Sequence, residues 1–194
     1  MTAPLTILVD IDAPVALWEK GLVDVARQDY PHLNIADAGT RNAWDLLKDV
    51  DADVATALMA TMNKPGFYRD LEPREGAFEA LHEMLDAGHN VMMCSTPSVY
   101  NPTCASDKLW WMERHGGLEL AKRTIMTLDK TVVRGDVLID DKDVITGSMA
   151  PEWTRIVWNE AYNQAATGPR MVQWDSWRDA IDEALTISYG RTAA

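Results

Sequence analysis

Short apolar runs with the character of β-strands alternate with helical patterns along this chain. The strand-like runs are residues 5–9, 90–94, 123–126, 137–139 and 155–158. Between them, residues 75–87 carry apolar side chains at helical spacing and residues 105–115 form another helical segment, and glycine follows each. Parallel strands have to be joined across a face of the sheet, and helices are the usual connection. The alternation therefore predicts the α/β fold class with a parallel central sheet.

The stretch from residue 14 to residue 71 interrupts this alternation. It holds three helix-like pieces and no clear strand: residues 15–28, 40–48 and 53–62. An insertion directly after the first strand is well placed to form a helical cap over the sheet edge, although the same helices could instead cover one sheet face. We expect a core of residues 1–13 and 72–194, with residues 14–71 as a small helical cap subdomain.

Paired acids follow two of the strand-like runs. Asp10 and Asp12 come directly after the first run, and Asp140 and Asp141 follow the fourth. In open parallel sheets the carboxyl ends of the strands meet at one edge, where ligands bind. Aspartate also favours turns and helix caps, so either pair alone is ambiguous. Together they favour a site for a hard cation, and carboxylates with water are the ligands that suit Mg²⁺.

Hydroxyl and cationic residues follow the second strand-like run. Ser95 and Thr96 stand at its end, and Lys108 lies early in the next helix. A hydroxyl and free backbone N–H groups at a strand-to-helix turn can hold a phosphate. Phosphoryl transfer needs a nucleophile, a cation that neutralises phosphate oxygens and donors for the remaining oxygens. The combined set of residues is typical of that chemistry.

Composition narrows the partners and the compartment. The 194 residues carry a formal net charge of −12, which argues against a nucleic acid polymer as partner, since binding one needs a basic face. The sequence shows no signal peptide and no segment long enough to span a membrane, so we expect no membrane partner and a cytoplasmic location. Cys94 and Cys104 are too few for a disulfide framework. A buried thiol is the more common role for Cys94 than a nucleophile.

This set of residues resembles the haloacid dehalogenase-like phosphohydrolases, whose signature is D-x-D, a Ser or Thr after a strand, a Lys and paired acids. The intervening sequence resembles one branch of them, the small 5′(3′)-deoxyribonucleotidases. The closer resemblance is carried by residues 71–73, 76–77, 94–97, 107–108, 127–133, 138–142, 145–147, 163–164 and 174–177. It extends over nearly the whole chain. It implies a Rossmann-like three-layer sandwich and, because family members pair, a homodimer.

The resemblance also implies a role for each residue of the signature. Asp10 matches the nucleophile that forms an aspartyl-phosphate. Asp12 matches the general acid that protonates the leaving nucleoside oxygen and then, as a base, activates water. Ser95 and Thr96 match the hydroxyl and its neighbour in the phosphate pocket, and Lys108 matches the cation that holds the phosphate.

A Mg²⁺ cofactor is implied by the same resemblance. Asp10, the backbone carbonyl of Asp12 and Asp141 match its ligands, and Asp140 lies alongside. The division of labour has a physical basis. A metal-bound Asp10 stays ionised, whereas the Asp12 side chain, which is off the metal, is free to exchange a proton.

The chain departs from the branch beside these motifs. The residue after Asp12 is usually glycine, which accepts a positive φ easily, and here it is Ala13 followed by Pro14. The branch usually carries an acid where Leu17 stands, and it often places a lysine near the phosphate where residues 98–100 supply none. These changes touch the pocket and leave the four motifs intact, so they affect substrate choice and rate.

Aromatic residues of the expected cap resemble a pocket that stacks a nucleobase. Trp18 and Trp44 fall at such positions, and Phe67 and Tyr68 stand where a further aromatic wall would be. Arg69 is the candidate cation for contacts with the base or sugar. Stacking on a base contributes about 1–3 kcal/mol, enough to influence substrate choice. The alternative is that these aromatic side chains pack the cap against the core.

The main hypothesis from the sequence is a Mg²⁺-dependent phosphatase that acts on small nucleoside monophosphates through an aspartyl-phosphate. dUMP and dTMP are the first substrates to test, because the resembling branch prefers them. Two alternatives stay open: the same chemistry on another small phosphate ester, and a catalytically weak ligand-binding or partner protein. The sequence does not reveal the preferred base and sugar or the choice between 5′ and 3′ phosphates.

Overall fold

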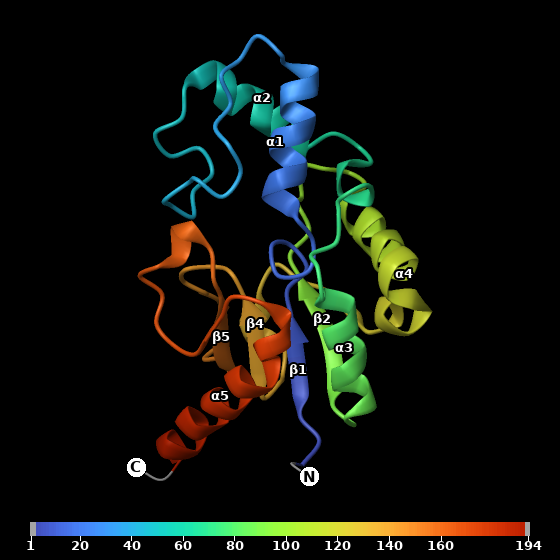
Figure 1. Cartoon of the computed structure of the whole chain (residues 1–194), viewed down its shortest axis with the longest axis vertical. Helices are drawn as coiled ribbons and strands as arrows, with labels where there is room; N and C mark the ends of the chain where they lie inside the picture. Colours follow the sequence, from blue (N-terminus) through green and yellow to red (C-terminus); the bar gives the residue numbers. More distant parts are fainter. Residues whose placement is uncertain (1–2, 193–194) are drawn as a thin grey trace.

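A computed structural model describes residues 3–192, and a parallel sheet lies at the centre of the molecule (Figure 1). The strands of the described chain are β1 (Thr6–Val9), β2 (Asn90–Ser95), β3 (Thr124–Met126), β4 (Val137–Asp140), β5 (Thr154–Trp158) and β6 (Arg170–Met171). They lie in the order β3-β2-β1-β4-β5-β6, and each neighbouring pair is parallel. The α/β fold class is thereby confirmed. The two-residue β6 adds an edge strand that no apolar run predicted.

Both faces of the sheet are buried, which explains why its strands are apolar at successive positions. Ile7 and Val9 of β1 belong to the large core cluster, whereas Leu8 between them packs with Leu138 and Trp153 in a smaller cluster. Successive side chains of a strand point to opposite faces, so each cluster occupies its own face.

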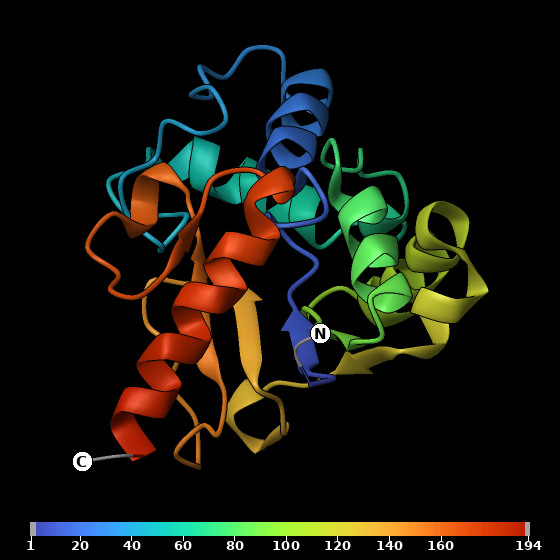
Figure 2. The same cartoon turned by 60° about the horizontal axis from the view of Figure 1, so that its bottom comes forward.

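The described chain contains five α-helices: α1 (Trp18–Asp29), α2 (Ala52–Met62), α3 (Ala77–Asp86), α4 (Cys104–Lys122) and α5 (Trp177–Thr192). α5 packs along β4, β5 and β6, and α3 packs on β2 (Figure 2). α4 continues past the expected end at residue 115, but Gly117 is non-helical, with φ of 81°, so the helix is kinked where the sequence predicted its stop. No helix of the described chain is long and apolar enough to cross a membrane.

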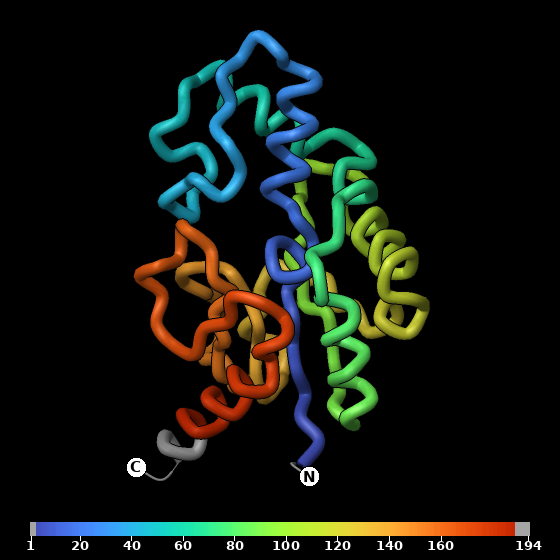
Figure 3. Tube along the Cα trace, viewed as in Figure 1, coloured from blue at the N-terminus to red at the C-terminus, as the bar shows by residue number. Residues whose placement is uncertain are grey.

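The strand order places a ligand site beside β1. The chain adds β2 and β3 on one side of β1 and then returns to add β4 on the other side. Such a reversal opens a crevice at the carboxyl ends of the strands on either side of it. Residues 14–71, called the cap segment below, contain α1 and α2 and lie beyond this end of the sheet (Figure 3).

One predicted helix of the cap segment is wrong. Residues 15–28 and 53–62 correspond to α1 and α2, but residues 40–48 form turns. Local hydrogen bonds explain the difference, because Arg41 donates to the carbonyl oxygens of Ala43 and Trp44 and the Asp45 carboxylate accepts from the backbone N–H of Leu47. Side chains that bond to nearby backbone groups compete with the helix for those groups.

Candidate active site

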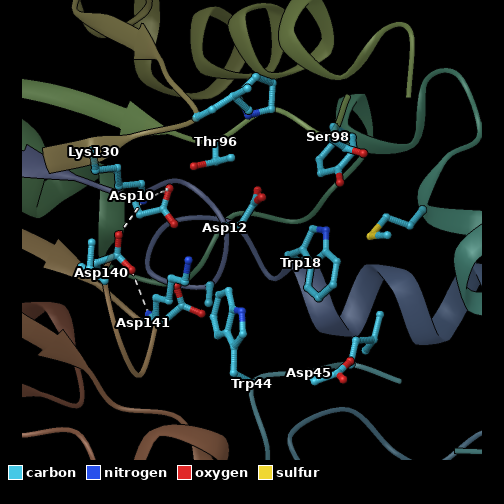
Figure 4. A pocket seen from close by; sticks show the side chains of 18 of the residues that line it. Asp10, Asp12, Trp18, Trp44, Asp45, Thr96, Ser98, Lys130, Asp140 and Asp141 are labelled. Carbon is cyan, nitrogen blue, oxygen red and sulfur yellow. Dashed lines mark hydrogen bonds and ion pairs between the residues drawn. The ribbon is translucent and has the colours of Figure 1, made fainter. Parts of the chain in front are cut away.

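Three carboxylates meet at the carboxyl ends of β1 and β4. Asp10 follows β1, Asp140 ends β4 and Asp141 comes next, and one carboxylate oxygen of each lies within 4.8 Å of the others. The Lys130 ammonium joins them, with Nζ 3.0 Å from Asp10 Oδ1 and 2.5 Å from Asp140 Oδ2. All four side chains are buried. We call the three carboxylates the acidic cluster (Figure 4).

The acidic cluster carries more negative charge than its surroundings compensate. Three carboxylates face one ammonium, that of Lys130, which leaves two charges without a partner. Burial, followed by the charges of Asp140 and Asp10, raises the pKa of Asp141 well above its usual range. Oδ1 of Asp141 is buried without a hydrogen-bond partner among the described residues. Uncompensated buried charge is costly, so the donor set fits a hard divalent cation in both charge and chemistry.

A second charged unit lies beside the acidic cluster. Lys108 Nζ lies 2.7 Å from Asp12 Oδ2, and it also donates to Ser95 Oγ and to the carbonyl oxygen of Thr96, each at 3.0 Å. Lys108 is 1% exposed, so its side chain is fixed in this position. Burial raises the pKa of Asp12, opposed by the Lys108 charge. A carboxyl with a raised pKa and one oxygen held in place suits proton transfer.

The turn after Asp12 is strained. Ala13 has a φ of +76°, in the left-handed region that costs a residue with a Cβ about 1–2 kcal/mol. The turn is held by two hydrogen bonds, from the N–H of Ala13 to the oxygen of Ala16 at 3.0 Å and from Arg74 Nε to the oxygen of Ala13 at 2.7 Å. The conformation that glycine usually provides in the resembling branch is thus retained here with alanine.

A cavity of about 590 Å³ opens over these groups, a size typical of small-molecule sites. Its charged side, which we call the core wall, comprises the acidic cluster, Asp12, Thr96, Lys130 and Lys142. Its opposite side, the cap wall, comprises Arg41 and Asp45 together with the larger apolar and aromatic set Trp18, Trp44, Leu46, Leu47, Met59, Met62 and Tyr68. Figure 4 shows Trp18 and Trp44 facing the carboxylates across the cavity. The cap wall is therefore mainly apolar and aromatic, with one cation and one acid, and the core wall is mainly ionic.

The structure brings eight of the twelve residues selected from the sequence to the lining of this cavity, and four are not among the lining residues. Ser95 and Lys108 are fully buried, and Lys108 connects Ser95 to the lining residue Asp12. Phe67 is buried with its ring edge-on to Tyr68 and is not among the lining residues, and Arg69 lies 4.0 Å from the centre of the Trp110 ring. Tyr68 thus lines the cavity and Phe67 does not, and Arg69 is not among the lining residues.

Sequence reasoning missed two residues that contact the acidic cluster. Lys130 lies in the run 127–133 that carried the family resemblance, yet no role was assigned to it. Tyr162 donates its hydroxyl hydrogen to Asp141 Oδ2. Neither residue belongs to a motif with fixed spacing. Their position beside the acidic cluster is therefore evident only from the three-dimensional path of the loops that follow β3 and β5.

The thiol next to Ser95 has no nucleophilic character. Burial raises the pKa of Cys94 to about 12, and the side chain is fully buried. It packs with Leu8 and Leu138 on one face of the sheet. A protonated, inaccessible thiol cannot attack a substrate at neutral pH, so Cys94 is a small core residue.

Comparisons with known proteins agree with this geometry. Residues 4–187 match the family described as 5′ nucleotidase, deoxy (pyrimidine), cytosolic type C. The chain is 36% identical over 177 residues to a Bordetella bronchiseptica protein provisionally named a 5′(3′)-deoxyribonucleotidase, covering 91% of this chain and 95% of that protein. It is 34% identical over 192 residues to the human cytosolic-type 5′(3′)-deoxyribonucleotidase, covering 94% and 96%.

A solved structure shares the fold. The HAD family hydrolase of Deinococcus radiodurans, with bound phosphate and sodium, superposes with a TM-score of 0.61 at 18% identity. The match covers 94% of this chain and 97% of that one. At this identity the likeness establishes the fold, and it agrees with the Rossmann-like arrangement of the sheet.

Proposed function

The chain belongs to the 5′ nucleotidase, deoxy (pyrimidine), cytosolic type C family, whose members are phosphoric monoester hydrolases, and on that premise we propose that it is a Mg²⁺-dependent phosphatase of deoxyribonucleoside monophosphates. The observation that carries the proposal is the buried, uncompensated acidic cluster beside the Asp12–Lys108 pair, under a cavity with an aromatic opposite wall. dUMP and dTMP are the first substrates to test.

Chemistry on the core wall follows from the positions of two carboxylates. The Asp10 carboxylate attacks phosphorus, the bond from phosphorus to the nucleoside oxygen breaks, and Asp12 donates a proton to that oxygen. Water then attacks the aspartyl-phosphate while Asp12 accepts its proton, which releases phosphate and restores Asp10. Lys108 fixes the Asp12 carboxylate and supplies a positive charge next to the phosphate oxygens.

The cofactor is proposed to be held by Asp10, the backbone carbonyl of Asp12 and Asp141, with Asp140 alongside. A bound Mg²⁺ would neutralise phosphate oxygens as negative charge develops on them. Lys130 bridges Asp10 and Asp140, so it limits the repulsion within the acidic cluster and orients both carboxylates.

Substrate choice is proposed to depend on the cap wall. Trp18, Trp44 and Tyr68 offer ring surfaces for a planar base at the far side of the cavity from the nucleophile. Residues 98–100 supply no counterpart of the lysine that the resembling branch often places near the phosphate. That difference keeps the alternative of another small phosphate ester, or of a catalytically weak binding protein, as a second candidate.

Phosphate release from a panel of nucleoside monophosphates and sugar phosphates, with and without Mg²⁺, tests the proposal. We expect hydrolysis of pyrimidine deoxynucleotides that is lost when the cation is removed. Fastest hydrolysis of a sugar phosphate would contradict the substrate class, and the absence of release from every compound would contradict the enzymatic function.

The family resemblance also leads us to propose a homodimer in the cytoplasm. Val99 lies before α4 and Leu109 within it, and both are exposed apolar residues that we propose contribute to pairing. Light scattering coupled to gel filtration measures the state directly. A monomer at micromolar concentration would contradict the expected pairing.

A further inference from the structure

Tyr162 stands between the acidic cluster and the cap segment. It lies on the short 3-10 helix Ala161–Asn163 that follows β5, and it is 6% exposed. Its hydroxyl donates to Asp141 Oδ2, and the neighbouring Asn163 amide donates to the backbone oxygen of Asp141 at 2.7 Å. Two adjacent residues thus hold the side chain and the backbone of one carboxylate of the cluster.

The other side of the Tyr162 ring belongs to the cap segment. The Arg41 guanidinium lies 3.5 Å from the ring centre, and the Trp44 ring meets Tyr162 edge-on at 5.7 Å. Arg41 is itself fixed, because its Nε lies 3.0 Å from Glu19 Oε2 of α1 and its NH1 donates to the carbonyl oxygens of Ala43 and Trp44. The loop that carries Trp44 is therefore anchored to α1 and rests on Tyr162.

The hydrogen bond from Tyr162 selects the oxygen that Asp141 presents to the cluster. Oδ2 is occupied by the tyrosine hydroxyl, whereas Oδ1 is buried without a partner among the described residues. Asp141 Oδ1 is therefore available to a cation shared with Asp10. Groups that fix a ligand from behind commonly change metal affinity about 10–100-fold when they are removed.

We propose that Tyr162 is a positioning residue that couples docking of the cap segment to cation binding at the acidic cluster. The inference rests on the proposed metal site, and it adds a link between that site and the cap wall. Contacts from Arg41 and Trp44 restrict the ring, the ring fixes Asp141, and Asp141 receives the cation. Because such a coupling is reciprocal, cation binding also stabilises the docked position of the loop.

Titration of the substrate-free protein with Mn²⁺, followed by calorimetry and by electron paramagnetic resonance, tests the first half of the coupling. Tyr162→Phe keeps the ring and removes the hydroxyl, and we expect its Kd for Mn²⁺ to rise about 10–100-fold. Arg41→Met keeps the hydroxyl and removes the ring contact, and we expect a rise of about 2–5-fold, in line with a cation–π contact.

Backbone amide hydrogen exchange of residues 40–50 tests the reverse effect, in which cation binding stabilises the docked position of the loop. We expect Mn²⁺ to slow exchange in this loop of the unsubstituted protein and to have little effect on it in Tyr162→Phe. Equal slowing in both proteins would overturn the coupling, because the hydroxyl would then be irrelevant to the loop.

Two matched variants control for general effects on folding. Arg178 lies 4.2 Å from the Trp177 ring centre and pairs with Glu83 at 3.0 Å, so Arg178→Met removes the same kinds of contact far from the cavity. Tyr100→Phe removes an exposed tyrosine hydroxyl. Both should bind Mn²⁺ as the unsubstituted protein does.

The outcomes separate this inference from the proposed function. If the unsubstituted protein binds Mn²⁺ and Arg41→Met binds it equally well, the coupling is wrong and the metal site stands. If the unsubstituted protein binds no divalent cation at millimolar concentration, the proposed cofactor is wrong and the coupling falls with it.

Discussion

The two walls of the cavity are built on different principles. The core wall consists mainly of charged side chains, and the acidic cluster and Lys130 within it are buried and bonded to one another. The cap wall consists mainly of apolar and aromatic side chains from helices and turns, and Trp44 there is 38% exposed. A rigid ionic surface suits a reaction that demands fixed geometry, whereas an adaptable aromatic surface suits recognition. We therefore assign chemistry to the core wall and substrate choice to the cap wall.

Asp10→Asn should have the largest effect, and it should change activity without changing the fold. The amide keeps the shape of the carboxylate but cannot form the aspartyl-phosphate, so we expect kcat to fall by about 10⁴-fold or more, as when other catalytic nucleophiles are removed. The fold should persist, because the substitution relieves repulsion in the acidic cluster. Phosphate release and circular dichroism measure the two effects. Substantial turnover by the purified variant would show that another group attacks phosphorus.

The core wall was predictable from the sequence for a physical reason. The carboxyl ends of parallel strands lie at the same edge of a sheet. Acidic residues that follow two such strands therefore lie close together when the two strands are neighbours. Lys108 was found because it lies early in the helix that follows one of the parallel strands. The position of Lys130 depends instead on the path of an irregular loop, which no local pattern encodes.

The cap wall was less predictable, since its residues come from segments with weak local preferences. Residues 40–48 have a helical pattern, but hydrogen bonds from Arg41 and Asp45 to nearby backbone groups hold them in turns. Phe67 and Tyr68 are adjacent in sequence, and only packing decides which ring enters the cavity. Local side-chain hydrogen bonds and packing therefore determined what sequence spacing could not.

Replacing the two buried lysines one at a time should show that the core wall holds two independent charged units, the Asp12–Lys108 pair and the acidic cluster with Lys130. Lys130→Met leaves the buried Asp140 without its ion-pair partner, which costs about 3–5 kcal/mol in the free energy of unfolding. Lys108→Met does the same to Asp12, whose side chain is 26% exposed, at a smaller cost. Saturating Mg²⁺ should restore much of the stability of Lys130→Met, because the cation replaces the lost positive charge in the acidic cluster. It should restore little in Lys108→Met. Urea unfolding with and without Mg²⁺ measures this difference.

An equal gain of stability by the two lysine variants in Mg²⁺ would contradict the independence of these two charged units. It would mean that the cation neutralises Asp12 as well as the acidic cluster. Glu152→Gln provides the control, since it breaks the exposed Arg134–Glu152 ion pair and should change stability by less than about 1 kcal/mol.

Alanine in place of Trp18 or Trp44 should affect recognition and spare the chemistry. Loss of a stacking surface costs about 1–3 kcal/mol, so kcat/KM for a pyrimidine nucleotide should fall about 5–150-fold. Hydrolysis of p-nitrophenyl phosphate, which lacks a base, should change little. Trp110→Ala is the matched control, because Trp110 is similarly exposed but lies outside the cavity. Equal losses on both substrates would show that the tryptophans serve the core wall.

Ala13→Gly should give the smallest effect, at the junction of the two walls. The φ of +76° costs alanine about 1–2 kcal/mol, and glycine adopts it freely but loses about 0.5–1 kcal/mol through its more flexible unfolded chain. The net expectation is a gain of about 0.5–1 kcal/mol in stability. Ala60→Gly in α2 is the matched control, and there the same substitution should destabilise by about 1 kcal/mol because φ is helical. A loss of stability in Ala13→Gly would show that the turn relaxes around alanine without strain, and the departure from glycine would then have no energetic consequence for either wall.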